Sequence, residues 1–189
     1  MTMQHSSMTI AEAQRDVRES HLGGATGMLV SGVLWVGCGV VALTSGSRTA
    51  MLAITFGGMS IFPVSMLIVR LLGRSGLLAH GNPLGQLARE SAFLMVLCIP
   101  LAFAAAIAKL EWFFPAMMVV VGMHYLPFAT LYGMRLYWAL GAAMMGAGYL
   151  LAFSGASFAT GAFVGGALEL AFAPLALLAT RREPAPVAT

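Results

Sequence analysis

No charged residue interrupts residues 24–44, which read GATGMLVSGVLWVGCGVVALT. About 20 apolar residues in a helix are enough to cross the hydrocarbon core of a bilayer, which is about 30 Å thick. Similar apolar stretches recur along the chain, and their lengths indicate helices rather than strands. The sequence therefore predicts an all-α polytopic membrane protein, a bundle of six transmembrane helices. We expect the spans at residues 24–44, 50–72, 88–108, 112–132, 134–153 and 157–179.

The composition supports the same fold class. Of the 189 residues, 59% are hydrophobic and only 9% are charged, and the mean hydropathy is +0.87. A soluble domain carries about 25% charged residues. Because six spans use roughly 120 residues, little of the chain remains for a soluble domain. We expect one membrane domain over residues 23–180, between a polar N-terminal arm at 1–22 and a cytoplasmic tail at 181–189.

The polar arm carries the pattern of a short helix. Thr9 and Glu12 have the spacing of a capping box, in which each side chain accepts a hydrogen bond from the other residue's backbone. Ala13 and Val17 then follow at helical spacing. The pattern predicts an amphipathic helix over about residues 10–21, lying on the membrane surface. The acidic residues of this arm and the length of the apolar run behind it argue against a cleaved signal peptide.

Lysine and arginine are distributed unevenly between the two sides of the predicted bundle. Positively charged residues are retained in the cytoplasm, so the richer side marks the inside of the cell membrane. We therefore expect both termini in the cytoplasm. With a net charge of only +3 and basic residues scattered at helix ends, we expect the lipid bilayer as the partner and no nucleic acid. One side has Arg48 and Lys109, and the other has Arg15, Arg18, Arg70, Arg74, Arg89, Arg135, Arg181 and Arg182.

Two ionisable residues lie deep in predicted spans. Glu169 is near the middle of 157–179, and His124, followed by Tyr125, is near the middle of 112–132. A charged side chain at the centre of a bilayer costs about 3 kcal/mol or more. Glu169 and His124 could therefore face each other, with Tyr125 beside them, in a midplane binding site that shares a proton, binds a cation or hydrogen-bonds a substrate. The alternative is a structural hydrogen bond between helices, with Glu169 neutral.

Four charged residues gather near the expected cytoplasmic interface. Arg70 and Arg135 end helices, and Glu90 begins one beside Arg89, so three of these charges have the sign that suits the helix dipole. We expect Glu90 to pair with one of the arginines. These residues either fix the topology and cap the helices, or they form a cytoplasmic gate or a site for an anionic headgroup.

No motif of an enzyme or cofactor site occurs in the sequence. It contains no Cys-x-x-Cys, no His-Glu-x-x-His and no phosphate-binding loop. Cys38 and Cys98 both lie within apolar stretches, so no disulfide framework is expected. We expect no catalytic residue, no metal site and no cofactor.

Three short motifs stand out along the chain. They read GNPLG at residues 81–85, EWFFP at 111–115 and ATLYGMRLYW at 129–138. Together they resemble a family of small bacterial multi-pass membrane proteins with no assigned function, over about residues 10–180. The resemblance implies a bacterial inner-membrane location. It supplies no activity and no site residue.

The sequence leaves three hypotheses of function open. The first is a small transporter or permease-like protein with Glu169 and His124 at its midplane site, which a weak repeat between residues 58–71 and 122–136 also favours. The second is a non-catalytic membrane subunit or interaction protein that works through packing. The third is a membrane enzyme that acts on a lipid-linked substrate at the cytoplasmic charged cluster. A homodimer is compatible with each of them, and the ion or small molecule involved is unknown.

Overall fold

The structure, a computed structural model, describes residues 8–181, and every regular element in this part of the chain is a helix. Six helices are long and apolar enough to cross a membrane. The prediction of a six-span all-α bundle is confirmed, and each predicted boundary lies within four residues of the observed one. The six spans are α2 (Ala25–Ser45), α3 (Ser47–Leu71), α4 (Leu84–Ala108), α5 (Phe113–Tyr132), α6 (Leu136–Ser154) and α7 (Phe158–Arg181).

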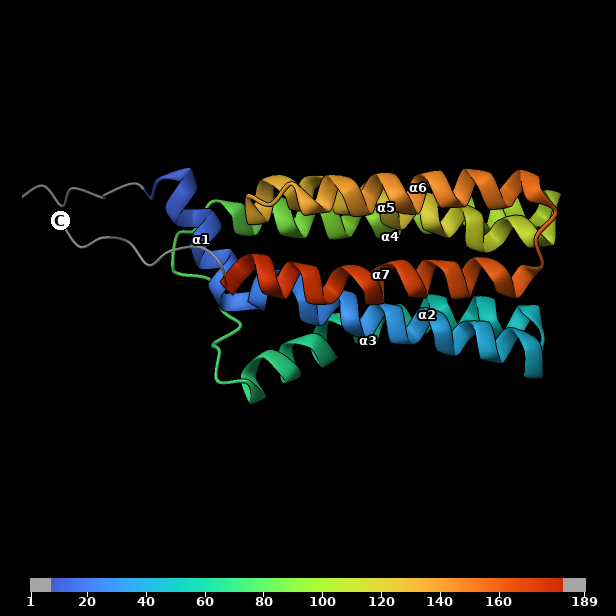
Figure 1. The fold of residues 1–189 in the computed structure, drawn as a ribbon, viewed down its shortest axis with the longest axis horizontal. Coiled ribbons are helices and arrows are strands. Elements are labelled where there is room, and N and C mark those ends of the chain that lie inside the picture. Colours follow the sequence, from blue (N-terminus) through green and yellow to red (C-terminus); the bar gives the residue numbers. More distant parts are fainter. Residues whose placement is uncertain (1–7, 182–189) are drawn as a thin grey trace, which may run out of the picture.

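Helix α7 occupies the middle of the bundle (Figure 1). It packs along α2 on one side and contacts α5 and α6 on the other. Helix α3 packs on the outside of α2, and α4 packs on the outside of α5. Most fully buried side chains therefore come from α2, α5, α6 and α7, while α3 and α4 expose many apolar side chains in the directions where lipid would lie.

The repeat suggested by the sequence does not correspond to equivalent positions in the fold. The stretch at residues 58–71 belongs to α3 at the edge of the bundle, and the stretch at 122–136 belongs mainly to α5 in its core. Both helices contain a proline, Pro63 in α3 and Pro127 in α5. In α3 the last turns after this proline diverge from the bundle (Figure 1).

Glycines bring α2 and α7 into backbone contact. A Cβ placed on Gly166 of α7 would lie 2.8 Å from the carbonyl oxygen of Gly32 on α2. Trp35 of α2 packs over Gly165 in the same way, with ring atoms 2.6 Å from the position of an added Cβ. Lipid tails are as apolar as the side chains, so helices in a membrane associate through close packing rather than through the hydrophobic effect. This interface is therefore built on small residues.

Replacing Gly166 by Ala should destabilise the bundle, because the added methyl group would force α2 and α7 apart. We expect a loss of about 1–3 kcal/mol, as for other overpacked interfaces, measured as a lower thermal unfolding midpoint in detergent. Gly146→Ala on α6 is the matched control, since an added Cβ there meets nothing within 4 Å. Equal midpoints for the two variants would contradict the close contact.

Helix α1 (Ile10–His21) precedes the spans and is joined to α2 by a short 3-10 turn at Leu22–Gly24. The predicted capping box is confirmed: the Glu12 amide donates to the Thr9 hydroxyl at 3.3 Å, and the Thr9 amide donates to the Glu12 carboxylate at 2.8 Å. The helix crosses the end of the bundle where α7 ends, here called the α1 end (Figure 1). The far end holds the links at residue 46, at 109–112 and at 155–157.

Helix α1 packs against protein, where the sequence suggested only a position on the membrane surface. It buries Ala13 and Val17, and its Gln14 and Arg18 side chains donate to the backbone of α5. Gln14 Nε2 lies 2.7 Å from the carbonyl oxygen of Thr130, and Arg18 Nη1 lies 2.6 Å from that of Tyr132. The last carbonyls of a helix lack partners within it, and a cation suits that end of the dipole. Helix α1 thus caps α5.

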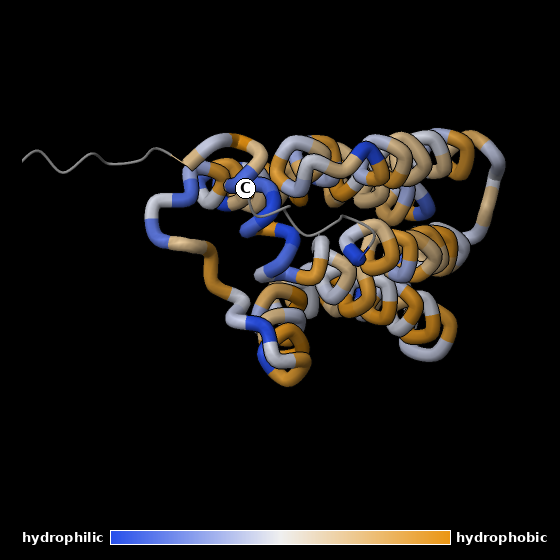
Figure 2. Tube along the Cα trace, turned by 60° about the vertical axis from the view of Figure 1, so that its left-hand side comes forward, coloured by the Kyte–Doolittle hydropathy of each residue, from blue (hydrophilic) through white to orange (hydrophobic). Residues whose placement is uncertain are grey.

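The opposite side of α1 holds the loop between α3 and α4. Asp16 Oδ2 accepts from the backbone amide of Ala79 at 2.9 Å and from Asn82 Nδ2 at 2.7 Å. The Ser20 hydroxyl donates to the Leu77 carbonyl at 3.1 Å. Figure 2 shows that hydrophilic positions gather in α1 and in this loop, whereas the spans are largely apolar. The loop is therefore fastened to α1 by directed polar contacts.

Asp16→Ala should release the loop, because it removes the acceptor of two hydrogen bonds. We expect the amide of Ala79 to exchange with deuterium about tenfold faster, which corresponds to about 1.5 kcal/mol. Glu19→Ala is the control, since it removes an exposed carboxylate from the same helix. Equal exchange in the two variants would show that Asp16 does not hold the loop.

Candidate functional site

Three helices converge on the carboxyl group of Glu169. Glu169 lies near the middle of α7 and is 0% exposed. Its Oε1 accepts a hydrogen bond of 2.7 Å from the hydroxyl of Tyr125 on α5. The Ser31 hydroxyl on α2 interacts with the same carboxyl outside the geometry of a full hydrogen bond. Within residues 8–181, Oε2 is buried without a hydrogen-bond partner. The carboxyl thus has one free acceptor in the interior of the bundle.

The helical period places Glu169 in the buried stripe of α7. Buried positions recur at spacings of three and four residues, which is the pattern of one helix face turned to its neighbours. A carboxyl in the middle of this stripe cannot reach either membrane surface, because its side chain is too short to extend past two turns of helix. The stripe consists of Ala162, Gly165, Gly166, Glu169, Ala173 and Ala176.

The core around Glu169 contains no positive charge. The helices α2, α5 and α6 have no lysine or arginine, and α7 has only Arg181, at its last residue. An ionised carboxylate in an apolar interior is costly unless a cation or several donors compensate it. Tyr125 is one donor. An ionised Glu169 would therefore need one compensating positive charge, either a proton on the carboxyl or a bound cation.

His124 does not join this group. Its Nδ1 lies 2.8 Å from the Ser91 hydroxyl on α4, and its ring packs edge-on against Phe128 with centroids 4.6 Å apart. Consecutive residues of an α-helix point about 100° apart, so Tyr125 and His124 cannot both face α7. The structure brings Tyr125 to Glu169 and directs His124 toward α4.

A column of tyrosines leads from Glu169 to the α1 end. The ring of Tyr125 stacks on that of Tyr137, and Tyr137 stacks on Tyr132, with centroid distances of 6.0 and 5.1 Å. The Tyr137 hydroxyl donates to the carbonyl oxygen of Gly23 at 2.5 Å. All three rings are buried. The column thus connects the Glu169 carboxyl, near the middle of α7, to the turn between α1 and α2.

The sequence can now be placed among known proteins. A model of a family of unknown function, DUF7010, matches residues 10–179. The chain belongs to this family. No curated protein and no solved structure matches the chain. The expected family without an assigned function is therefore confirmed, and membership supplies no activity for the Glu169 site.

The four charged residues expected at the cytoplasmic interface lie on the surface of this DUF7010 protein. Arg70, Arg89, Glu90 and Arg135 are all exposed. Glu90 accepts a hydrogen bond of 2.7 Å from Gln86 on the preceding turn of α4. Over the described part of the chain, no ion pair joins Glu90 to an arginine. Arg70 lies in the last turn of α3, as expected, whereas Arg135 is the N-cap residue of α6 and Glu90 lies in the second turn of α4.

Sequence reasoning missed the serine beside Glu169 and the serine that contacts His124. Ser31 contributes to the Glu169 site, and Ser91 holds His124. Each is a lone hydroxyl within or near an apolar run, where it commonly bonds to its own helix. The sequence does not show which way a serine within a span faces. That Ser31 faces the Glu169 carboxyl follows from the rotation of α2 in the packed bundle.

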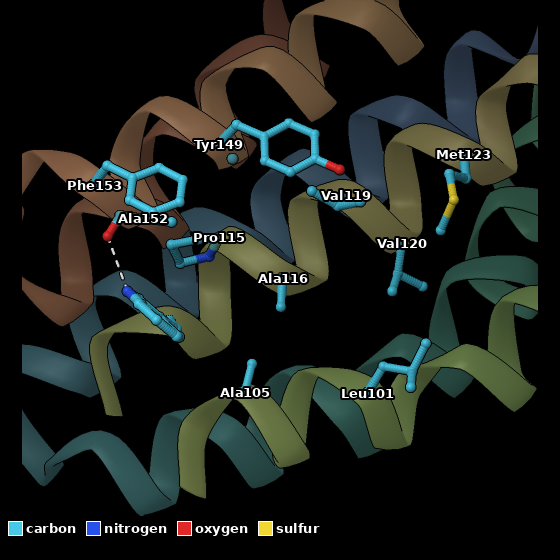
Figure 3. Close-up of a pocket in the computed structure, with 12 residues that line it drawn as sticks. Leu101, Ala105, Pro115, Ala116, Val119, Val120, Met123, Tyr149, Ala152 and Phe153 are labelled. Atoms are coloured by element: carbon cyan, nitrogen blue, oxygen red, sulfur yellow. Dashed lines mark hydrogen bonds between the residues drawn. The ribbon is translucent and has the colours of Figure 1, made fainter. Parts of the chain in front are cut away.

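A separate apolar hollow lies between α4, α5 and α6 (Figure 3). Its volume is about 290 Å³, and its lining includes Leu101, Val119, Met123 and Tyr149. Trp112 closes one end, where its indole nitrogen donates to the Ala152 carbonyl at 2.9 Å. None of the Glu169 site residues lines this hollow. Its surface suits hydrocarbon, such as a lipid chain or an apolar helix.

Tyr125→Phe should destabilise the protein, because both oxygens of Glu169 would then lack a donor. We expect a loss of about 1–2 kcal/mol, seen as a lower thermal unfolding midpoint in detergent. The control is Tyr149→Phe, which removes the same hydroxyl from a side chain that is 60% exposed. An equal midpoint for both variants would show that the Tyr125 hydroxyl adds nothing to the site.

Proposed function

We propose that this DUF7010 protein is a small transporter, and that Glu169 and Tyr125 form the site for the cation it moves or for the cation that drives a solute. The observation that carries the proposal is the free Oε2 of Glu169, a buried acceptor at the middle of the bundle. Ionisable residues inside a membrane are costly, and they commonly mark the path of an ion or substrate.

The location of the site fits this role. Transporter sites lie near the membrane midplane, where several helices meet. Glu169 is near the middle of α7, and Tyr125 and Ser31 approach it from α5 and α2. The site thus lies between the α2–α3 side and the α4–α5–α6 side of the bundle. A relative movement of these two sides would change access to the carboxyl.

We place the α1 end in the cytoplasm of a bacterial cell, with the spans in the inner membrane. The support is the distribution of charge. Among the described residues, Arg48 and Lys109 lie at the far end, and every other lysine or arginine lies at the α1 end. Positively charged residues are retained on the cytoplasmic side. Both termini are then cytoplasmic.

The apolar hollow favours a second candidate, a non-catalytic membrane subunit. A partner helix seated between α4 and α6 would cover Tyr149 and Phe153, which are both exposed large side chains. A homodimer through this face is one form of it. The third hypothesis, an enzyme acting on a lipid-linked substrate, would rely on four charged residues that are exposed at the α1 end, where no ion pair joins Glu90 to an arginine among the described residues.

The test of transport is ion flux in liposomes that contain the purified protein. Fluorescent indicators inside the liposomes report entry of H⁺, Na⁺ or K⁺ under an imposed membrane potential. We expect wild type to exceed empty liposomes for at least one of these cations and Glu169→Gln to lose that flux, because an amide does not ionise and cannot bind a proton or a cation as a carboxylate does. Glu90→Gln makes the same chemical change at an exposed position and should retain the flux.

Equal flux in wild type and Glu169→Gln would contradict a role for the carboxyl. Wild-type flux no higher than that of empty liposomes for all three cations would contradict cation transport itself. Stable co-purification with a second membrane protein, lost when the hollow is filled by Ala116→Phe, would instead favour the subunit.

A further inference from the structure

The oxygen atoms around Glu169 are too few for a metal ion. The carboxyl, the Tyr125 hydroxyl and the Ser31 hydroxyl are the polar groups that meet there. Pro174 lacks an amide hydrogen, so it also leaves the Leu170 carbonyl without its helical donor. Hard cations take six or more oxygen ligands in proteins. No group of three or more His, Cys, Asp or Glu side chains that could hold a metal occurs within residues 8–181. A proton needs one acceptor only.

No other charge competes for the site. Helix α2 contributes Ser31 and carries Cys38 as its sole titratable side chain. Helix α5 contributes Tyr125 and Tyr132, while His124 is turned to α4, and α6 contributes Tyr137. The remaining ionisable groups of these core helices are Tyr149, which is exposed, and Arg181, at the end of α7. A single proton on Oε2 would therefore make the interior neutral.

The tyrosine column extends from the Glu169 site toward one end of the bundle, the α1 end. Tyr125 donates to Glu169, Tyr137 stacks on Tyr125, and the Tyr137 hydroxyl reaches the Gly23 carbonyl at the α1 end. Toward the far end, the core around the same helices is filled by phenylalanine rings, among them Phe114 and Phe158, at 5.0 Å between centroids. Hydroxyl groups and a backbone carbonyl can hydrogen-bond a moving proton, and phenylalanine rings cannot.

The turn at the start of this column is an unusual piece of backbone. Leu22, Gly23 and Gly24 have φ angles of 52°, 62° and 80° in succession. Leucine rarely adopts such a value, which is strained for a side chain with a Cβ. A Cβ on Gly24 would lie 2.2 Å from the Tyr137 hydroxyl oxygen. The Tyr137 hydroxyl is thus in direct contact with the link between α1 and α2.

We propose that the species bound at Glu169 is a proton, which exchanges with the α1 end of the bundle along Tyr125 and Tyr137. This deepens the proposed transport function and rests on it. On uptake the Glu169 carboxylate gains one proton from water at the α1 end and becomes a neutral acid. Each tyrosine hydroxyl that gives up a proton takes another in its place, so Tyr125 and Tyr137 both end the step neutral. Release returns the proton and restores the carboxylate.

The first experiment identifies the bound species without measuring transport. Dicyclohexylcarbodiimide modifies protonated carboxyls in apolar surroundings, and mass spectrometry of the α7 peptide reports its reaction with Glu169. The full-length protein in liposomes is labelled at several pH values, with Na⁺, K⁺ or choline at constant ionic strength. We expect labelling of Glu169 to fall about tenfold per pH unit once the carboxyl is mostly ionised, and to be the same in all three salts.

Protection of Glu169 by Na⁺ or K⁺ would overturn the proton and assign a metal cation. An absence of labelling at every pH would overturn proton exchange altogether. Failure of the transport proposal is distinguishable, because pH-dependent labelling without any flux would keep the proton site and remove transport. Flux together with protection of Glu169 by Na⁺ would keep the transport proposal and remove the proton as the bound species.

The second experiment tests from which end of the bundle protons reach Glu169. Liposomes are prepared with different pH values inside and outside, and trypsin cleavage at the exposed Arg74 shows which molecules have the α1 end outward. We expect labelling of Glu169 to follow the pH at the α1 end. In Tyr137→Phe this response should be at least several-fold weaker, while Tyr149→Phe should behave as wild type. Labelling that follows the pH at the far end, or an unchanged response in Tyr137→Phe, would overturn the route.

Discussion

The backbone contact between α2 and α7 is the constraint on which the rest of the bundle depends. Because Gly32 on α2 and Gly166 on α7 have no side chain, the backbones of these two spans are in direct contact. Any larger residue there would move α7 away from α2. Because Glu169 lies one turn after Gly165 and Gly166 on the same face, the close packing is what buries its carboxyl. The burial of the Glu169 carboxyl therefore depends on glycine at positions 32 and 166.

The same contact explains why the carboxyl meets Tyr125. Once α7 is seated against α2, its buried stripe also faces the groove beside α5, where Tyr125 is the polar residue at matching depth. Ser31 lies one residue before Gly32, so the helix that supplies the close approach also supplies a hydroxyl. Neighbouring positions of α2 therefore supply both the close contact with α7 and a hydroxyl group near Glu169.

The sequence predicts the spans well because bilayer thickness imposes their length, and every one of the six was located within four residues. The capping box was also readable, since Thr9 and Glu12 interact across three residues. The partners of Glu169 could be predicted only in part: Tyr125 was among the expected site residues, but so was His124, which contacts α4 instead. His124 and Tyr125 lie at the same depth, and choosing between them needs the rotation of α5, which depends on distant packing. The docking of α1 was missed for the same reason: Gln14 and Arg18 find partners more than 100 residues away.

The contacts of α1 also set an order of events during synthesis. Helix α1 precedes its polar partners in the loop and at the end of α5 by 57 to 116 residues. It cannot dock on α5 until the ribosome has delivered the end of the fourth span. The loop partners Leu77, Ala79 and Asn82 are made earlier than the end of α5. Helix α1 can therefore be fastened in two stages, first to the loop between α3 and α4 and then to the last turn of α5.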